Sequence, residues 1–226
     1  DLLARGKRPF VVGGTGLYIK ALLQGLSEAA PSDKTVRRAL REEADRLAPA
    51  TLHRRLEQID PASAARIHPN DGFRIVRALE VHALTGRTMS EVQAAHRFPE
   101  SPYAALKFGL RCERDTLYAR IETRVDAMLA EGFLEEVEAL RAAGLDPGCK
   151  AMQSLGYRHL NTFLDGACDW EETVRTLKRD HRRYAKRQLT WFGADPEVQW
   201  VGPDEIETAA VSVDTFLSTD APISPP

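Results

Sequence analysis

Two arginines are spaced so that they could hold one anionic group together. Arg120 and Arg124 lie four residues apart in a segment with helical periodicity, so both side chains project from one side of the expected helix. Two guanidinium groups placed in this way can grip a diphosphate through paired, charge-assisted hydrogen bonds. Each arginine could instead pair with a nearby acid, such as Glu122 or Asp126, as surface arginines commonly do. The spacing alone leaves both interpretations open.

A glycine-rich turn offers a second place where phosphate could bind. Gly13-Gly14-Thr15-Gly16 follows a short apolar run at 9–12 and precedes a segment with helical spacing. Backbone N–H groups in such a turn can approach phosphate closely, and the N-terminus of the following helix adds a favourable dipole. The turn lacks the lysine of the Walker pattern and does not match the dinucleotide fingerprint. A role as a simple connection therefore fits the turn about as well as phosphate binding does.

A basic segment predicts contact with a polyanion. A solvated helix face usually mixes charges of both signs, whereas residues 178–187 would be basic around most of a helix and contain the single acid Asp180. We therefore expect phosphate contact whose affinity falls steeply with salt. The cations of this segment are Lys178, Arg179, Arg182, Arg183, Lys186 and Arg187.

A second group of donors lies earlier in the chain. These side chains could bond to a nucleic-acid backbone and to base edges, although a capped surface helix would present much the same residues. The group comprises Arg66, His68, Asn70, Arg74 and Arg77.

Several other classes of protein are poorly supported. The sequence has no His-Glu-x-x-His, no paired cysteines and no Gly-x-Ser-x-Gly, which argues against zinc hydrolases and the common serine hydrolases. Its three cysteines, Cys112, Cys149 and Cys168, are widely spaced and odd in number, which favours reduced thiols in a cytoplasmic protein. No apolar stretch is long enough to cross a bilayer and the N-terminus has no signal-peptide pattern, so no membrane partner is expected.

The formal net charge of −2 hides an asymmetry along the chain. Residues 195–226 contain acidic side chains and no Lys or Arg, so the residues before them carry a net positive charge. The near-neutral total therefore does not argue against RNA binding.

The elements around the candidate residues predict an α/β fold with a parallel sheet. Strands are expected at 9–12, 106–112 and 198–201, and the glycine turn would lie at the carboxyl edge of the sheet. Helix caps are expected at Asp60-Pro61, at Asn70-Asp71 and at Gly86. Helices are expected at 34–47, 50–58, 61–67, 71–85, 115–131, 133–143, 151–164 and 170–192.

Three regions follow from these patterns. Residues 1–26 and 100–202 are predicted to form the α/β core, residues 27–99 an all-helical insertion, and residues 203–226 an acidic flexible tail. The first residues, Asp1 to Lys7, resemble the last turn of an amphipathic helix, so a preceding segment is expected.

Five blocks of the sequence, taken in order, resemble the tRNA dimethylallyltransferase family, also called tRNA isopentenyltransferases. The resemblance covers roughly residues 5–201, and the combination is far more specific than any one block. The blocks are Val11-Val12-Gly13-Gly14-Thr15-Gly16-Leu17-Tyr18, His68 to Val81, Arg120 to Asp126, Met152 to Arg158, and Tyr184-Ala185-Lys186-Arg187-Gln188-Leu189-Thr190-Trp191-Phe192.

The resemblance implies a P-loop-NTPase-like parallel sheet, its first strands missing from this chain, and an inserted helical domain that binds tRNA. It implies transfer of a dimethylallyl group from dimethylallyl diphosphate to N6 of the adenosine 3′-adjacent to the anticodon. By position, Arg124 steadies the leaving diphosphate and Thr15 lines the reaction channel. Gly13, Gly14 and Arg120 would contact the diphosphate.

The resemblance also implies a set of tRNA contacts. The partners are the tRNA anticodon stem-loop and dimethylallyl diphosphate, and a monomer is expected. Mg²⁺ would accompany the diphosphate, with its ligands upstream of this chain, so no metal residue is assigned. The residues in segments that touch tRNA are Phe73, Arg74, Arg77, Gln153, Tyr157 and Arg158, and Lys186 and Arg187 would add backbone contacts.

Two departures from the family pattern stand out. The phosphate-binding loop and the aspartate that acts as general base in the family would lie before Asp1, so the chain alone is expected to be inactive. Gly193 occupies a position where many relatives carry a basic residue, which weakens the case for phosphate contact there.

Other functions remain open on the sequence. A prenyltransferase acting on free adenine nucleotides would keep the glycine turn and the arginine pair, but it would not need the helical insertion. A non-catalytic RNA-binding module would bind tRNA without turnover. A nucleotide or small-molecule kinase could share the sheet with its phosphate turn.

Overall fold

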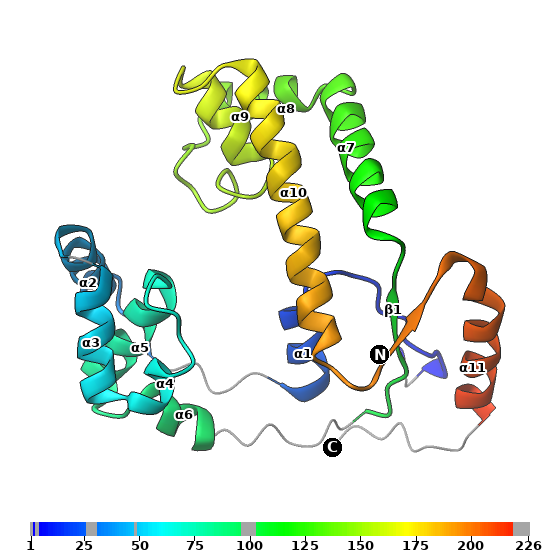
Figure 1. Cartoon of the computed structure of the whole chain (residues 1–226), viewed down its shortest axis with the longest axis horizontal. Coiled ribbons are helices and arrows are strands. Elements are labelled where there is room, and N and C mark those ends of the chain that lie inside the picture. The colour runs from blue at the N-terminus through cyan, green and yellow to red at the C-terminus, as the bar shows by residue number, and fades with distance from the viewer. Residues whose placement is uncertain (1, 3–4, 26–30, 48, 96–102, 219–226) are drawn as a thin grey trace. The chain divides into compact units, whose positions relative to one another are not determined.

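The computed structural model describes residues 2, 5–25, 31–47, 49–95 and 103–218, and it divides into two compact units (Figure 1). Of the described residues, one unit contains 2, 5–16 and 104–218, and the other contains 17–25, 31–47, 49–95 and 103. The fold is mostly helical with a small parallel sheet.

The helical unit consists of short helices connected by capped turns. Asp60 and Asp71 accept hydrogen bonds from the backbone N–H groups of Ser63 and Arg74, and Gly86 ends a helix in the left-handed conformation, which confirms the three predicted caps. The short helix after Thr88 was not predicted. The helices are α1 (Gly16–Gln24), α2 (Lys34–Arg46), α3 (Pro49–Ile59), α4 (Pro61–Ala64), α5 (Gly72–Thr85) and α6 (Met89–Ala95).

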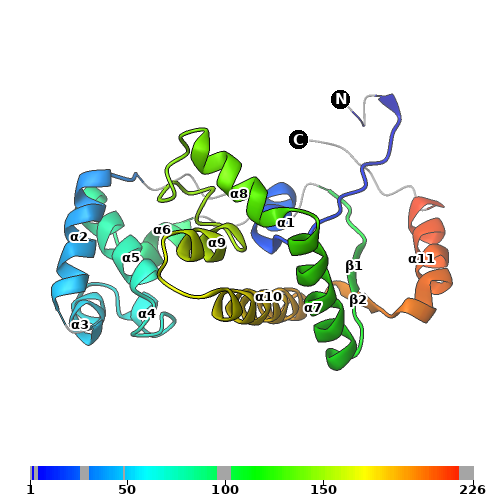
Figure 2. The same ribbon diagram turned by 90° about the horizontal axis from the view of Figure 1, so that it is seen from above.

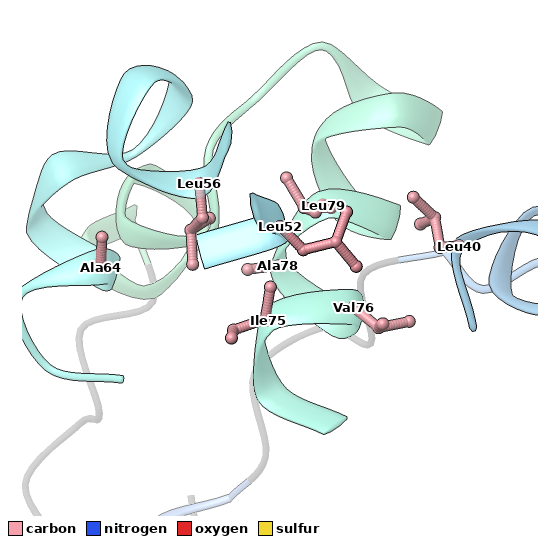
Figure 3. Close-up of a cluster of buried hydrophobic side chains, with 8 residues drawn as sticks. All are labelled: Leu40, Leu52, Leu56, Ala64, Ile75, Val76, Ala78 and Leu79. Carbon is pink, nitrogen blue, oxygen red and sulfur yellow. The ribbon is translucent and has the colours of Figure 1, made fainter. Parts of the chain in front are cut away.

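Apolar side chains from α2 to α5 form the core of this unit (Figure 3). Leu56 on α3 and Ile75 on α5 are almost fully buried, and truncating either side chain to Ala is expected to cost about 2–5 kcal/mol. This core fixes α5, which carries several of the residues predicted to bind tRNA. The members of the core are Leu40, Leu52, Leu56, Ala64, Ile75, Val76, Ala78 and Leu79.

A buried carboxylate connects α2 to α5. Glu80 has no exposed side-chain surface and accepts hydrogen bonds from Arg77 Nη1 at 2.8 Å, Arg37 Nη2 at 3.0 Å and the backbone N–H of Asp33 at 3.0 Å. Burial alone would raise the pKa of Glu80, but the bonds from Arg77 and Arg37 outweigh burial and lower it. The carboxylate therefore stays ionised and holds the start of α2 against α5.

The second unit contains the sheet and the longest helix. β1 and β2 pair in parallel, with Lys107 opposite Val198 and Leu110 opposite Val201. Lys107 Nζ also bonds to Asp195 at 2.9 Å, which fixes the chain just before β2. The elements are β1 (Lys107–Leu110), α7 (Arg114–Ala130), α8 (Phe133–Ala142), α9 (Tyr157–Leu164), α10 (Trp170–Gly193), β2 (Val198–Val201), the short 3-10 helix η2 (Pro203–Glu205) and α11 (Ile206–Ser218).

Two of the predicted elements near this sheet were wrong. Residues 9–12 do not form a strand, and Phe10 and Val12 are 89% and 81% exposed. A strand requires a hydrogen-bonded neighbour, and within the described residues β1 pairs with β2 alone. Residues 206–218 of the predicted flexible tail form α11, whereas residues 219–226 lie outside the described part of the chain.

The predicted helix at 151–164 begins later than expected, at Tyr157. Gly156 has a φ of 98°, and this left-handed conformation interrupts any helix that would continue from residue 151. The predicted helix at 61–67 likewise ends at Ala64.

Replacing Glu80 by Gln tests the buried carboxylate. We expect Glu80→Gln to lower the free energy of unfolding of the helical unit by about 2 kcal/mol, because two arginines lose their charged acceptor while staying partly hydrated. The folded pKa of Glu80 lies below its unfolded value. Its contribution is therefore present above roughly pH 4.3 and is lost as the pH falls through the folded pKa.

Amide hydrogen exchange in α2 and α5 measures this difference in the unit concerned. Glu42→Gln is the matched control, because Glu42 is an exposed α2 residue with a single distant ion pair. An equal effect of the two substitutions at pH 7 would contradict the assigned role of Glu80.

Candidate functional site

The side chains of α10 organise the second unit. This helix runs beside α7 in both views (Figures 1 and 2). Lys178 Nζ bonds to Asp126 at 2.8 Å, and one turn further along α10 Arg182 bonds to Glu122. The guanidinium of Arg182 also lies 5.8 Å from the centre of the Tyr118 ring. These contacts fix which face of α7 is turned toward α10.

Arg120 and Arg124 are left exposed on α7 by this pairing. Glu122 and Asp126 bond to α10, and each lies two residues from an arginine along α7, where helical side chains do not face each other, so that alternative was wrong. Neither arginine has an ion pair or hydrogen bond with any described residue. Both belong to a shallow, open surface along one face of α7, called the arginine groove below, whose lining is Thr116, Ala119, Arg120, Thr123, Arg124 and Ala127. Two unpaired guanidinium groups one helical turn apart can bind an anion with several oxygens.

The glycine turn contacts the other end of α10. Gln188 Nε2 donates a hydrogen bond to the carbonyl oxygen of Gly14 at 2.9 Å. A Cβ atom on Gly16 would lie 2.0 Å from Nε1 of Trp191, so only glycine fits beneath the indole ring. Thr15 lies between these two contacts and is exposed, as is Gly13.

The structure does not bring the two predicted diphosphate contacts into one pocket. The groove that contains Arg120 and Arg124 is lined by α7 alone, whereas Gly13 and Gly14 belong to a turn held by α10. The described residues thus provide two separate surfaces that a diphosphate could contact.

Much of the basic cluster on α10 is neutralised internally. Asp180 accepts hydrogen bonds from Arg158 at 2.7 Å, Arg179 at 3.0 Å, His159 Nε2 at 3.2 Å and Arg183 at 3.5 Å. Burial alone would raise the pKa of Asp180, but the bonds from Arg179, Arg158 and His159 outweigh burial and hold it well below its usual range. Asp180 is therefore ionised, and it attaches α9 to α10.

Two cations near the end of α10 differ from the rest of the cluster. Lys186 is exposed and has no ion pair or hydrogen bond from its side chain in the described part of the chain. Arg187 is also exposed and lies 5.6 Å from the ring centre of Tyr184. This half of α10 is therefore the part with charge available for an external phosphate.

The residues predicted to bind tRNA on α5 have different surroundings. Phe73 is 72% exposed, in the first turn of the helix. Arg74 pairs with Asp71 at the helix start and remains mostly exposed, whereas Arg77 bonds to the buried Glu80. Phe73 and Arg74 are thus presented outward, and Arg77 has a structural bond as well.

The predicted contacts around α9 are similarly mixed. Gln153 Nε2 donates to the carbonyl oxygen of Pro147 at 2.9 Å. The hydroxyl of Tyr157 donates to Glu136, and this bond raises the pKa of Tyr157, with burial adding to the effect. Both side chains are partly used by the fold, so only their remaining surface could contact RNA.

The described residues contain no cluster of three or more His, Cys, Asp or Glu side chains arranged to hold a metal ion. No helix in the described part of the chain is both long and apolar enough to cross a membrane.

Comparison with known proteins identifies similar sequences. A sequence model of the family described as IPP transferase matches residues 1–195. The chain is 53% identical over 201 residues to the tRNA dimethylallyltransferase of Geobacter sulfurreducens, covering 89% of this chain and 65% of that protein. It is also 53% identical over 211 residues to the tRNA dimethylallyltransferase of Desulfatibacillum aliphaticivorans, covering 93% of this chain and 69% of that protein.

A solved structure has a similar fold. The tRNA isopentenylpyrophosphate transferase of Bacillus halodurans is 38% identical, with a TM-score of 0.62, and the match covers 95% of this chain and 68% of that one. The chain thus spans about two thirds of the length of these relatives.

Inorganic pyrophosphate is a direct probe of the arginine groove. We expect Arg124→Ala to weaken pyrophosphate binding by about tenfold or more, because a charge-assisted pair of hydrogen bonds is lost. Titration calorimetry at fixed ionic strength measures the affinity. Arg175→Ala is the matched control, since Arg175 is an exposed arginine already paired with Glu172. If the two substitutions weakened pyrophosphate binding equally, the effect would be one of overall charge, and pyrophosphate would not bind specifically at the arginine groove.

Proposed function

Because the chain belongs to the IPP transferase family, we propose that it takes part in transferring a dimethylallyl group from dimethylallyl diphosphate to tRNA. The observation that carries the proposal is the open groove with Arg120 and Arg124, whose neighbouring acids are bonded to α10. This arrangement leaves two cations available for a diphosphate.

The acceptor we propose is N6 of the adenosine 3′-adjacent to the anticodon. The amine nitrogen forms a bond to C1 of the dimethylallyl group, the C1–O bond breaks, and its electron pair leaves with the diphosphate. A proton is then lost from N6. Arg124, supported by Arg120, stabilises the negative charge that develops on the departing oxygen. Thr15 lines the path of the reacting groups.

The remaining contributions to the chemistry are smaller. Residues 1–226 contain no Gly-x-x-x-x-Gly-Lys-Ser/Thr pattern, so diphosphate contact within them is assigned to the arginine pair and to the backbone of Gly13 and Gly14. Mg²⁺ is expected to neutralise part of the diphosphate charge, and no step is assigned to it here.

The helical insertion and the end of α10 are proposed to bind the anticodon stem-loop. The adenosine must leave its stack before its N6 can react, and an exposed aromatic ring such as Phe73 offers a surface on which a loop base can stack. Arg74, Gln153 and the α9 residues would add contacts, while Lys186 and Arg187 would bind phosphates. We further propose that the protein acts as a monomer in the cytoplasm.

Prenyl transfer from radiolabelled dimethylallyl diphosphate tests this function. The full natural gene product is incubated with anticodon stem-loop RNA and, in parallel, with free AMP. Label in the RNA alone is expected, and Arg124→Ala should lower the rate at least about 100-fold through loss of leaving-group stabilisation. Arg175→Ala should leave the rate within twofold of wild type.

Label in AMP would instead assign the chain to enzymes that act on free nucleotides. RNA binding without label in either acceptor would support a non-catalytic binding module. The same assay with residues 1–226 alone tests the expectation that these residues are inactive by themselves.

Salt dependence separates the free cations of α10 from the paired ones. For the anticodon stem-loop, we expect Lys186→Ala and Arg187→Ala each to reduce the slope of log K against log salt by about 0.7–0.9, the amount for one phosphate contact. Arg175→Ala on the same helix should leave the slope unchanged, because that arginine is paired with Glu172. If the slope of log K against log salt were unchanged in all three variants, this part of α10 would not belong to the RNA interface.

A further inference from the structure

Two side chains in the last turns of α10 contact the glycine turn and hold it in place. Gln188 and Trp191 lie three residues apart on the helix, and each contacts a different glycine of the turn. We infer that Gln188 and Trp191 are positioning residues that fix the glycine turn, and with it Thr15, for group transfer. The inference rests on the proposed function for what the turn does, and on the contacts below for how the turn is held.

The contact with Gln188 is a directed hydrogen bond. Its side-chain amide donates to the carbonyl oxygen of Gly14 at 2.9 Å, across a separation of 174 residues in the sequence. A Cβ on Gly14 would lie 2.0 Å from that same nitrogen, so the amide sits directly against the backbone. Gln188 can rotate away from an added methyl group, but this would break the hydrogen bond that orients the carbonyl.

The contact with Trp191 is steric. A Cβ on Gly16 would lie 2.0 Å from Nε1, 2.1 Å from Cδ1 and 2.7 Å from Cε2 of the indole. Gly16 is buried, while Trp191 remains 47% exposed. The indole therefore covers Gly16 with one part of its surface and remains partly in solvent.

Within the described residues, the segment before the turn has no strand partner that would anchor it. In the described structure residues 9–12 pair with no strand, and Phe10 and Val12 are exposed. The contacts from α10 on either side of Thr15 are therefore important in setting its position.

The same end of α10 also carries the exposed cations Lys186 and Arg187. Since α10 is a continuous helix, a phosphate bound by these cations would be rigidly connected to Gln188 and Trp191. Binding of the RNA backbone should therefore restrain the glycine turn as well as the helix.

Hydrogen exchange of residues 11–18 tests the positioning role without any turnover. In the full natural gene product, Gln188→Met keeps the length of the side chain but removes the donor, and Trp191→Ala removes the cover over Gly16. We expect exchange of this segment to become about tenfold faster in each variant. Adding anticodon stem-loop RNA should slow it in the wild type and have less effect in Gln188→Met.

Prenyl transfer then separates positioning from a merely structural role. We expect kcat to fall by about 10- to 100-fold in Gln188→Met, with the dissociation constant for the RNA within about twofold, because a displaced turn misaligns reacting groups. Trp191→Phe, which keeps an aromatic cover, should recover most of the kcat lost in Trp191→Ala. Thr190→Ala is the matched control, because among the described residues its hydroxyl donates only to the backbone carbonyl of Lys186 in the same helix.

The inference would be overturned if hydrogen-exchange rates of residues 11–18 in Gln188→Met and Trp191→Ala matched those in Thr190→Ala. A fall in RNA affinity as large as the fall in kcat would also overturn it. If the melting temperature of Trp191→Ala lies far below that of the wild type, the inference is judged on the results for Gln188→Met alone. Absence of prenyl transfer by the wild type would contradict the proposed function, whereas the exchange measurement would still decide how the turn is held.

Discussion

Charge pairing between α7 and α10 is the interaction on which the candidate site depends. Each of these partly exposed ion pairs contributes only about 1 kcal/mol to stability, so their importance lies in how they orient α7. The bonds of Glu122 and Asp126 to Arg182 and Lys178 fix which face of α7 is turned toward α10. Arg120 and Arg124 lie two residues from these acids and project from a different face of α7, so the groove stays open when α10 packs against α7.

The charge of α10 is distributed unevenly, although its sequence is basic almost throughout. In the half nearer α9, the ionised Asp180 accepts hydrogen bonds from Arg158, His159 and Arg179 and so connects α9 to α10. Toward the end of the helix there is no such acid, and Lys186 and Arg187 are exposed. A count of basic residues would overstate the surface available to RNA, because a cation already bonded to a carboxylate has less to gain from a phosphate.

Local signals predicted much of the fold. The caps at Asp60, Asp71 and Gly86 and the strands around 107–110 and 198–201 depend on neighbouring residues or on short periodicities, so the sequence pattern contains them. The prediction of a strand at 9–12 was wrong because a short apolar run does not by itself supply a pairing partner. The acid partners of Arg182 and Lys178 could not be foreseen, since they lie 60 and 52 residues away.

The glycine turn illustrates the same limit at the candidate site. Glycines are often conserved for a left-handed conformation, yet none of Gly13, Gly14 and Gly16 has a positive φ. At Gly14 and Gly16 the requirement is space, because Gln188 and Trp191 occupy the volume where a Cβ would lie. The local sequence pattern predicts that these glycines either contact phosphate or form a simple connection. The structure adds a third reason, which is that the backbone must pass directly beneath side chains of a helix more than 170 residues away.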